Sequence, residues 1–594
     1  MAARNFQRLF LAVCFTAMAI LSGASGAAEI PVALVLSPAA KVVRSPGERQ
    51  FESLAKQFVE SFFKTNPEQA TAIGEHRFDK RVRDLSVAGL ARERKLYHAT
   101  LAAVKRINAA SLSSQYRVDY HIMMNELEGR LFAIEVLKEQ DWDALSYVPA
   151  NGIYVLLARD FAPLPSRLAS VKARLEQIPG ALKVAKANLK NPPRIFTETA
   201  VDQNKGAIGL IRDELDMYVK DAPQMKAALA PSRKKAIAAL EAYGAWLEKE
   251  LLPRSTGDFR LGAANYRRKL KFSLESDITP EEILRRAEGE FAATQRALYD
   301  VAAPLYKQYF PQMPLPEDHK AVVRAVFKKL GDDQPNDGNV LQLATNDLAE
   351  ATAFIREKKL LTLPDAPVKI IVMPEFQRGV ATAYCDAPGA LEKNLDTFFA
   401  ISPTPAGWSA EQIDSYYRED NRSMLKDLTV HEAMPGHYVQ GVIANKAYAP
   451  TLMRRIVYSG TFAEGWAVYA EQMMADAGFG GAPVKMQQLK MRLRVITNAI
   501  IDQKIHAGSM TEKEAMDLMM NEGFQEEREA AGKWRRALLT STQLSTYYVG
   551  SAEVIDLRRA YEAKYGAGDM RKMHDSMLSF GTISVRHVRE LMGL

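Results

Sequence analysis

Apolar side chains recur at helical spacing through most of this 594-residue chain, and this periodicity constrains the fold more than any other feature. Between residues 50 and 63, Phe51, Leu54, Phe58 and Phe62 fall on one helix face. The same spacing predicts helices over residues 91–110, 115–139, 165–191, 204–219 and 231–250. N-capping patterns predict three further helix starts, at Thr279-Pro280-Glu281-Glu282, Ser409…Gln412 and Thr511…Glu514.

Strand-like stretches are few. Residues 368–373 and 397–401 are rich in β-branched and aromatic side chains, and each stretch ends near a proline. The sequence therefore predicts a mainly α fold with a small β element. A chain of this length exceeds one ordinary core, so we expect two lobes, an N-terminal helical lobe over residues 28–270 and a second lobe over residues 271–594.

The first 27 residues resemble a secretory signal. Arg4 and Arg8 precede an apolar run over residues 9–21, which is short for a bilayer span, and small residues follow to Ala27. We expect cleavage after Ala27 and export, with the periplasm as destination in a Gram-negative cell. An uncleaved membrane anchor is the alternative. No cysteine follows the apolar run, so no lipid anchor is expected, and Cys385 is the one cysteine left in the mature chain.

The charge pattern excludes some partners. The formal charge is +7, and loss of Arg4 and Arg8 with the signal lowers it to +5. Lys and Arg alternate with Asp and Glu instead of forming one basic patch, so we expect no nucleic-acid partner. Beyond the signal no run of 18 apolar residues occurs, so no stable membrane insertion is expected after cleavage.

One segment carries the pattern of a metal-dependent hydrolase. Residues 428–440 read Leu-Thr-Val-His-Glu-Ala-Met-Pro-Gly-His-Tyr-Val-Gln. In the usual H-E-x-x-H pattern two histidines on one helix face bind zinc beside a general-base glutamate. His431 and His437 lie six residues apart, which on a regular helix separates them by about 120°. We expect Pro435 and Gly436 to bulge out and to restore the usual spacing. The alternative is two ordinary helix histidines.

A second segment offers the third ligand that catalytic zinc sites need. Residues 461–472 hold Glu464 and Glu471, seven residues apart and hence on nearly the same helix face, among Ala, Trp, Val and Tyr. An acid in such surroundings needs a partner if it is buried. We predict Glu464 as the ligand and Glu471 as the group that orients a ligand histidine. The alternative for each is a solvent-exposed glutamate on an amphipathic helix.

These two segments resemble the bacterial family DUF885, a group of predicted metallopeptidases. Its pattern H-E-A-x-P-G-H matches residues 431–437, and its pattern E-G-W-A-x-Y-x-E matches residues 464–471, at every specified position. Residues 66–74, 159–179 and 502–581 also contain matches to the family. Tyr438, Asn498 and the pair Ser509-Met510 depart from it.

The resemblance implies a helical zinc-peptidase-like fold. It implies one Zn²⁺ per chain, with His431, His437 and Glu464 as ligands and Glu432 as the catalytic base. The departures do not affect these four residues, but they leave the residues of the substrate pocket undetermined.

The expected reaction is hydrolysis of peptide bonds in small peptides. Glu432 would take the proton of the attacking water and give it to the leaving amine. Tyr547 is the first candidate to stabilise the oxyanion, followed by His574 and His506, and each of them has the alternative of a packed core side chain. We expect Arg536 or Arg586 to bind the C-terminal carboxylate of a peptide, which favours a carboxypeptidase or dipeptidase; the alternative for Arg586 is a surface position. His506 and Tyr384 also line the expected substrate site. Residues 397–401 offer a strand edge for an extended peptide.

Other functions remain open from the sequence. A zinc amidohydrolase acting on a non-peptide or cell-wall amide fits the same motif, as does a purely structural zinc site. A non-catalytic metal-binding helical protein is a further alternative, which the presence of Glu432 disfavours. The oligomeric state, the position of cleavage and the choice of zinc over manganese or cobalt do not follow from the sequence.

Overall fold

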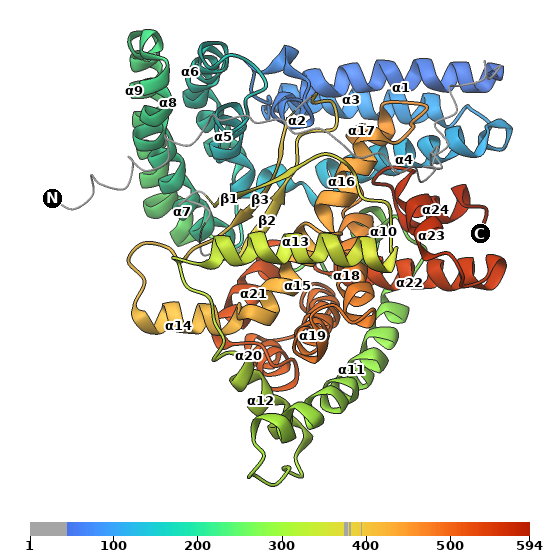
Figure 1. Cartoon of the computed structure of the whole chain (residues 1–594). Helices are drawn as coiled ribbons and strands as arrows, with labels where there is room; N and C mark the ends of the chain where they lie inside the picture. Colours follow the sequence, from blue (N-terminus) through green and yellow to red (C-terminus); the bar gives the residue numbers. More distant parts are fainter. Residues whose placement is uncertain (1–43, 374–377, 379–381, 394) are drawn as a thin grey trace, which may run out of the picture. The chain divides into compact units, whose positions relative to one another are not determined.

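The computed structural model describes residues 44–373, 378, 382–393 and 395–594, and the segment from Arg44 to Leu594 forms one compact unit (Figure 1). Helices make up most of it and enclose one three-stranded sheet, which confirms the predicted mainly α fold with a small β element. The signal segment expected over residues 1–27 lies outside the described residues. The boundary expected near residue 270 stays a prediction, since a helix over residues 263–274 crosses it.

The helices that precede residue 260 pack against one another, with α1 on α3, α3 on α4, and α6 on α9. Their apolar positions recur with the period that the sequence showed, and these positions are buried. Their bounds are α1 Pro46–Thr65, α2 Pro67–Ile73, α3 Val87–Val104, α4 Ser114–Leu131, α5 Ala150–Ala158, α6 Leu164–Asn188, α7 Arg194–Gly209, α8 Leu215–Asp221 and α9 Lys226–Trp246.

The remaining helices surround the segments that carry the motifs. The bounds before the first motif are α10 Ala263–Leu274, α11 Pro280–Tyr309, α12 His319–Leu330, α13 Val340–Lys358 and α14 Ala410–Glu419. Those from the first motif onward are α15 Arg422–Glu432, α16 His437–Lys446, α17 Met453–Ile456, α18 Gly460–Asp476, α19 Gly481–His506, α20 Glu512–Asp517, α21 Glu527–Leu539, α22 Ser545–Tyr565, α23 Met570–Leu578 and α24 Val585–Leu591. None of the described helices is long and apolar enough to cross a membrane.

Side-chain caps begin three of these helices where the sequence predicted them. Thr279 accepts a hydrogen bond from the N–H of Glu282 at the start of α11. Reciprocal capping boxes begin α14, between Ser409 and Gln412, and α20, between Thr511 and Glu514. Each cap satisfies backbone N–H groups that have no partner inside the helix.

The sheet has the order β1-β3-β2, with β1 Val368–Val372, β2 Ala383–Asp386 and β3 Thr397–Ile401. β1 pairs parallel to β3, and β2 pairs antiparallel to β3. The sequence predicted β1 and β3 but placed a loop from Cys385 onward, where β2 in fact runs to Asp386. The expectation that residues 397–401 present a free edge is wrong, because β3 is the central strand and both of its edges are paired.

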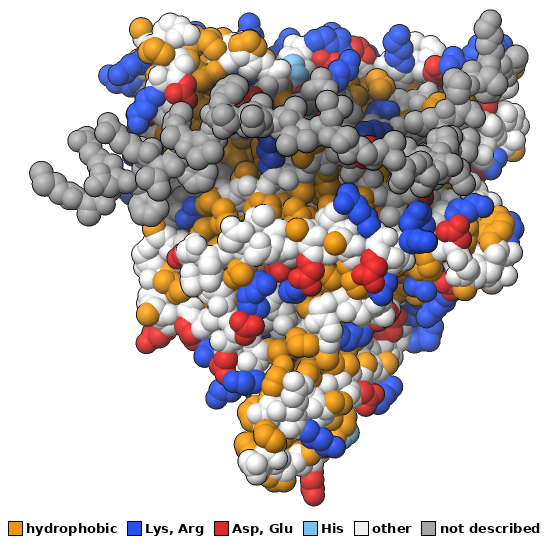
Figure 2. Space-filling view, in the orientation of Figure 1, with side chains coloured by type: hydrophobic (Ala, Val, Ile, Leu, Met, Phe, Trp, Pro, Cys, Tyr) orange, Lys and Arg blue, Asp and Glu red, His pale blue; other side chains and the backbone are white. Residues whose placement is uncertain are grey.

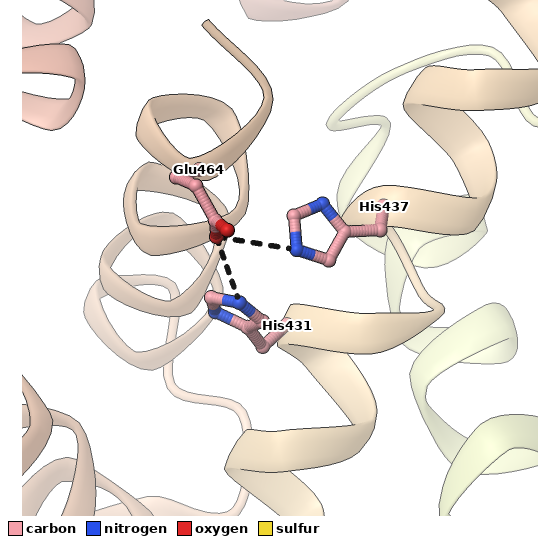
Figure 3. Close-up of side chains that lie close together, drawn as sticks. All are labelled: His431, His437 and Glu464. Atoms are coloured by element: carbon pink, nitrogen blue, oxygen red, sulfur yellow. Dashed lines mark ion pairs between the residues drawn. The ribbon is translucent and has the colours of Figure 1, made fainter. Parts of the chain in front are cut away.

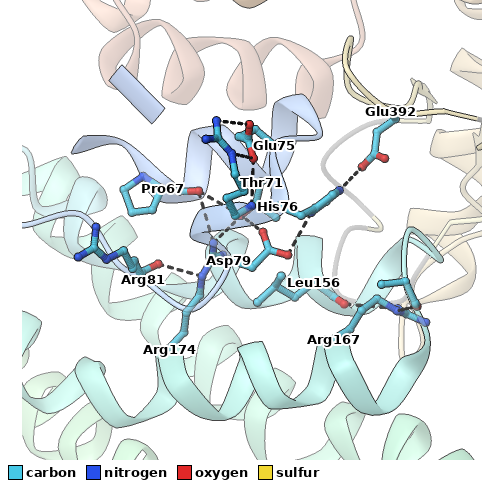
Figure 4. A network of polar contacts seen from close by, with 12 residues as sticks. Pro67, Thr71, Glu75, His76, Asp79, Arg81, Leu156, Arg167, Arg174 and Glu392 are labelled. Atoms are coloured by element: carbon cyan, nitrogen blue, oxygen red, sulfur yellow. Dashed lines mark hydrogen bonds and ion pairs between the residues drawn. The ribbon is translucent and has the colours of Figure 1, made fainter. Parts of the chain in front are cut away.

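The loop between β2 and β3 is fastened to the N-terminal helices (Figure 4). The N–H of Leu391 donates to the carbonyl of Ile73 at 2.8 Å, and the ring of His76 lies 2.9 Å from Glu392 and 3.0 Å from Asp79. Asp79 also accepts from Thr71, which in turn accepts from Arg174 of α6. This network holds one side of the sheet in place.

Two glycines allow α18 and α22 to approach each other closely. A Cβ on Gly465 would lie 2.3 Å from the backbone of Gly550, and a Cβ on Gly550 would lie 1.9 Å from the carbonyl oxygen of Thr461. Both contacts are with backbone atoms, which cannot rotate away. The pair therefore tolerates no side chain at the crossing.

We expect Gly550→Ala to lower the free energy of unfolding by about 1–3 kcal/mol, because the added methyl group must push two helices apart. Chemical denaturation of the purified protein measures the change. Gly532→Ala on α21 is the matched control, since no atom lies within 4 Å of a Cβ built there. Equal stability of the two variants would contradict the close crossing.

We expect His76→Gln to be more destabilising in acid than in base. Burial lowers the pKa of His76, but Asp79 and Glu392 outweigh it and raise the pKa above its ordinary value. Stability from this pair is therefore fully present below the unfolded pKa, about 6.5, and is lost as the pH rises through the higher folded pKa. Thermal unfolding of both proteins across that range measures the effect. A difference that grows with rising pH would contradict the ion pair.

Candidate metal centre

A break in the helix, at residues 433–436, shapes the first motif. α15 ends at Glu432 and α16 begins at His437. The N–H of Gly436 donates to the carbonyl of Val430 at 2.9 Å, and a Cβ on Gly436 would lie 1.7 Å from the carbonyl oxygen of His431. The sequence predicted a bulge in one continuous helix. The structure instead has two helices joined by a tight turn that admits only glycine at this position.

The second motif supplies a glutamate to this turn from α18. Trp466 is fully buried and its indole N–H donates to the carbonyl of Pro435 at 2.9 Å, which fastens α18 to the break. Glu464 lies two residues earlier in the same helix. The indole bond explains why a tryptophan follows the glutamate at this spacing.

Three side chains converge on one point between the helices (Figure 3). One Glu464 oxygen lies 3.4 Å from His437 Nε2 and 3.7 Å from His431 Nε2, and one ligand atom from each residue lies within 4.8 Å of the others. Tetrahedral zinc with bonds near 2.1 Å places its ligand atoms roughly 3.4 Å apart. The same carboxylate oxygen is buried and accepts no hydrogen bond. The residues therefore fit a zinc ion.

The cluster is partly open to solvent. The three side chains keep 11% (His431), 18% (His437) and 21% (Glu464) of their surface exposed. A structural zinc site is closed by four protein ligands, whereas a catalytic site keeps one position for water or substrate. Three candidate ligands with residual exposure match the second kind.

Electrostatic interactions favour an ionised glutamate beside the histidines. Burial raises the pKa of Glu464, but the nearby rings of His431 and His437 outweigh it and hold the pKa well below its ordinary value. An ionised carboxylate is the form that binds a cation.

Glu471 and Asp427 lie behind His431. Glu471 is 1% exposed and its carboxylate lies 2.5 Å from His431 Nδ1, which leaves Nε2 facing the other two candidate ligands. Such a carboxylate fixes the tautomer and orientation of a ligand histidine. Asp427, one turn before His431 on α15, was not expected from the sequence. Burial and the neighbouring charge of Glu471 raise the pKa of the Asp427 carboxyl group well above its ordinary value.

Glu432, the expected general base, is held by the sheet. Its carboxylate accepts a hydrogen bond from the backbone N–H of Cys385 on β2 at 3.0 Å. Burial and the charge of Glu464 raise its pKa, while His431 and His437 lower it, and the net shift is upward. A raised pKa suits a group that takes up and releases a proton during turnover.

Two tyrosines stand near the candidate ligands. Tyr547 of α22 accepts a hydrogen bond from Arg536 at 3.0 Å, and burial together with the charge of Glu464 raises its pKa. Tyr458, which the sequence did not predict, is 66% exposed, and its surroundings, including the charges of Glu464 and Glu432, raise its pKa. Tyr458 lies in the short connection before α18, where no periodic pattern could identify it.

Two expected histidines lie in the core instead of the cleft. His574 is fully buried, with Nδ1 2.7 Å from the carbonyl of Leu360 and Nε2 2.8 Å from the hydroxyl of Tyr469, and burial lowers its pKa to about 4. His506 is 1% exposed, and its Nε2 lies near the carbonyls of Ala537 and Thr540. The structure thus assigns both rings to packing and corrects their expected roles. Sequence alone does not distinguish a buried histidine from a ligand.

Tyr384 and Cys385 occupy the edge strand β2. Tyr384 is half-buried, and burial with the charge of Asp386 raises its pKa to about 12, while its hydroxyl interacts with Tyr154 of α5. Its side chain therefore faces α5. Burial and the charge of Glu432 raise the pKa of the Cys385 thiol, which disfavours the nucleophilic thiolate.

The fold and this cluster define a class of mainly helical proteins with a candidate His₂Glu metal centre. Two helices joined by a tight turn supply the histidines, and a third helix supplies the glutamate. More particularly, the chain belongs to the family described as bacterial proteins of unknown function, DUF885, whose model matches residues 67–592. The family expected from the two motifs is thereby confirmed. No curated protein matches the chain.

Two solved structures share the fold. One, from Shewanella oneidensis, is described as a "putative lipoprotein of unknown function". It is 32% identical, with a TM-score of 0.79, and the match covers 92% of this chain and 100% of that one. A Colwellia psychrerythraea protein with the same lipoprotein description is 18% identical, with a TM-score of 0.75 and coverage of 92% and 98%. Lipoproteins are exported, so these descriptions agree with the expected export of this chain.

We expect Glu471→Gln to weaken zinc binding roughly 10- to 100-fold, because the amide holds His431 less firmly and makes it a poorer ligand. Competition with a chromophoric chelator measures the affinity. Asp476→Asn, at the exposed end of the same helix, is the control and should bind zinc as the unmodified protein does. Unchanged affinity in the Glu471 variant would contradict its orienting role.

Proposed function

We propose that this protein is an exported zinc-dependent peptidase acting on small peptides, in the periplasm where the cell has an outer membrane. The observation that carries the proposal is the convergence of His431, His437 and Glu464. Glu432 follows His431 directly, as the last residue of α15. A binding protein or a structural zinc site needs no acid with a raised pKa next to its ligands. The partial exposure of the cluster also favours catalysis.

The residues around the cluster divide the chemistry among them. When bound, zinc supplies a Lewis acid that acidifies water and polarises a carbonyl group. Glu432 takes the proton of the attacking water and passes it to the leaving amine. Tyr458 and Tyr547 present hydroxyl groups that can donate to the developing oxyanion. Glu471 keeps His431 oriented.

Among the described strands β2 pairs only with β3, and its other edge suits an extended peptide. Residues alternate along an antiparallel pair, so one set of backbone groups bonds to β3 and the other points away. The N–H of Cys385 belongs to the outward set, since it donates to Glu432. A substrate strand added along this edge would lie beside the catalytic base, and main-chain hydrogen bonds would bind it with little dependence on side chains.

We expect Glu432→Gln to bind one zinc ion and to lose peptide cleavage by a factor of roughly 10² or more, because the amide cannot accept the water proton. Metal analysis and a mixed peptide library read by mass spectrometry test both points on the same preparations. Glu411→Gln, an exposed residue of α14, should retain zinc and activity.

The library should contain non-peptide amides as well. Zinc binding with cleavage of those amides alone would replace the peptidase with an amidohydrolase. Failure to bind zinc after reconstitution would reject the proposal.

A further inference from the structure

Lys533 is a largely buried lysine whose ammonium group has no partner among the residues that the structure describes. It lies on α21, where Ala530, Lys533 and Ala537 form the buried face, and 8% of its surface is exposed. Among the described residues its ammonium group makes no ion pair and no hydrogen bond. The buried Lys490 of α19 is different, because it pairs with Glu419 at 2.7 Å.

The surroundings of Lys533 are mostly positive. Burial and the charges of Arg494 on α19 and of Arg536, one turn further along α21, lower the pKa of Lys533 well below its ordinary value, so that an anion bound beside it would favour the charged ammonium form. Arg494 is neutralised by Glu529, which lies one turn before Lys533 on the same helix. Arg536 is exposed and pairs with no carboxylate among the described residues, while it donates to the hydroxyl of Tyr547. Lys533 and Arg536 are therefore the two basic residues of this cluster that have no carboxylate partner among the described residues.

The cluster adjoins the candidate metal centre. Arg536 donates to the hydroxyl of Tyr547 on α22, and α22 crosses α18 where Gly550 meets Gly465, the residue after Glu464. The charge of Glu464 acts on both Lys533 and Tyr547. Glu464 faces His431 and His437 as the third candidate metal ligand, so it is not free to pair with Lys533. A buried cation without an anion costs stability, and proteins keep such groups where a ligand supplies the missing charge.

We propose that Lys533 and Arg536 bind the free C-terminal carboxylate of a peptide substrate, which makes the protein a carboxypeptidase. The inference rests on the proposed peptidase function and defines its substrate class. Arg536 reaches this carboxylate from the exposed side of α21, while Lys533 reaches it from the buried side. A carboxylate held there sets the distance between the chain end and the scissile bond, so that cleavage removes a short C-terminal piece.

Binding to the Glu432→Gln protein tests the inference without turnover. The probes are N-acetylated tri-alanine as the free acid, its C-terminal amide, and an amide that ends in glutamate. Calorimetry should show the free acid binding at least about tenfold more tightly than the simple amide. Lys533→Met, added to the same protein, should bind acid and amide alike. Arg535→Met removes a charge from the exposed face of α21 and should keep the preference.

Stability gives a second readout. If the lysine serves substrate, Lys533→Met should leave the melting temperature unchanged or raise it, because a buried unpaired charge is removed. A large fall in melting temperature with an intact acid preference would overturn the inference and make Lys533 structural.

Two other results separate this inference from the proposed function. Zinc-dependent cleavage of acids and amides at equal rates would retain the peptidase and reject the carboxylate site. Equal binding of the free acid and the glutamate-ending amide would replace the chain end with an acidic side chain as the recognised group.

Discussion

The close crossing of α18 and α22 is the constraint on which the candidate site depends. Gly465 and Gly550 bring two backbones together where no side chain fits. α18 carries Glu464 and Glu471, and α22 carries Tyr547, so one crossing fixes a candidate ligand, the carboxylate behind a second ligand and a candidate oxyanion donor. Trp466 then fastens the same helix to the turn between the two histidines.

Burial of charge organises what surrounds that crossing. His431 is held by Glu471, Glu464 faces both histidines, and Glu432 accepts a backbone hydrogen bond from the sheet. On the visible surface acidic and basic side chains are interspersed (Figure 2), and water and salt screen their charges. Inside the protein the same charged groups interact more strongly, because less water screens them.

Local patterns predicted the parts of the fold that local forces decide. Helix spacing gave α1 and α6 with small errors at their ends and a capping pattern gave the start of α11, because an amphipathic stripe and a capping side chain act within a few residues. The sequence did not predict strand β2, because its four residues show no alternation of apolar and polar side chains. It forms because β3 offers it an edge and Glu432 accepts the N–H of Cys385.

The sequence by itself determined the family, the mainly helical fold and the residues that form the candidate metal centre, because those residues occur in short motifs with fixed spacing. Only the tertiary structure decided which other polar residues surround that centre. His574 and His506 lie in the core, whereas Tyr458 and Lys533, from separate parts of the chain, lie where the charge of Glu464 acts on them. Their neighbours lie far away along the chain, and packing alone determines which side chains meet.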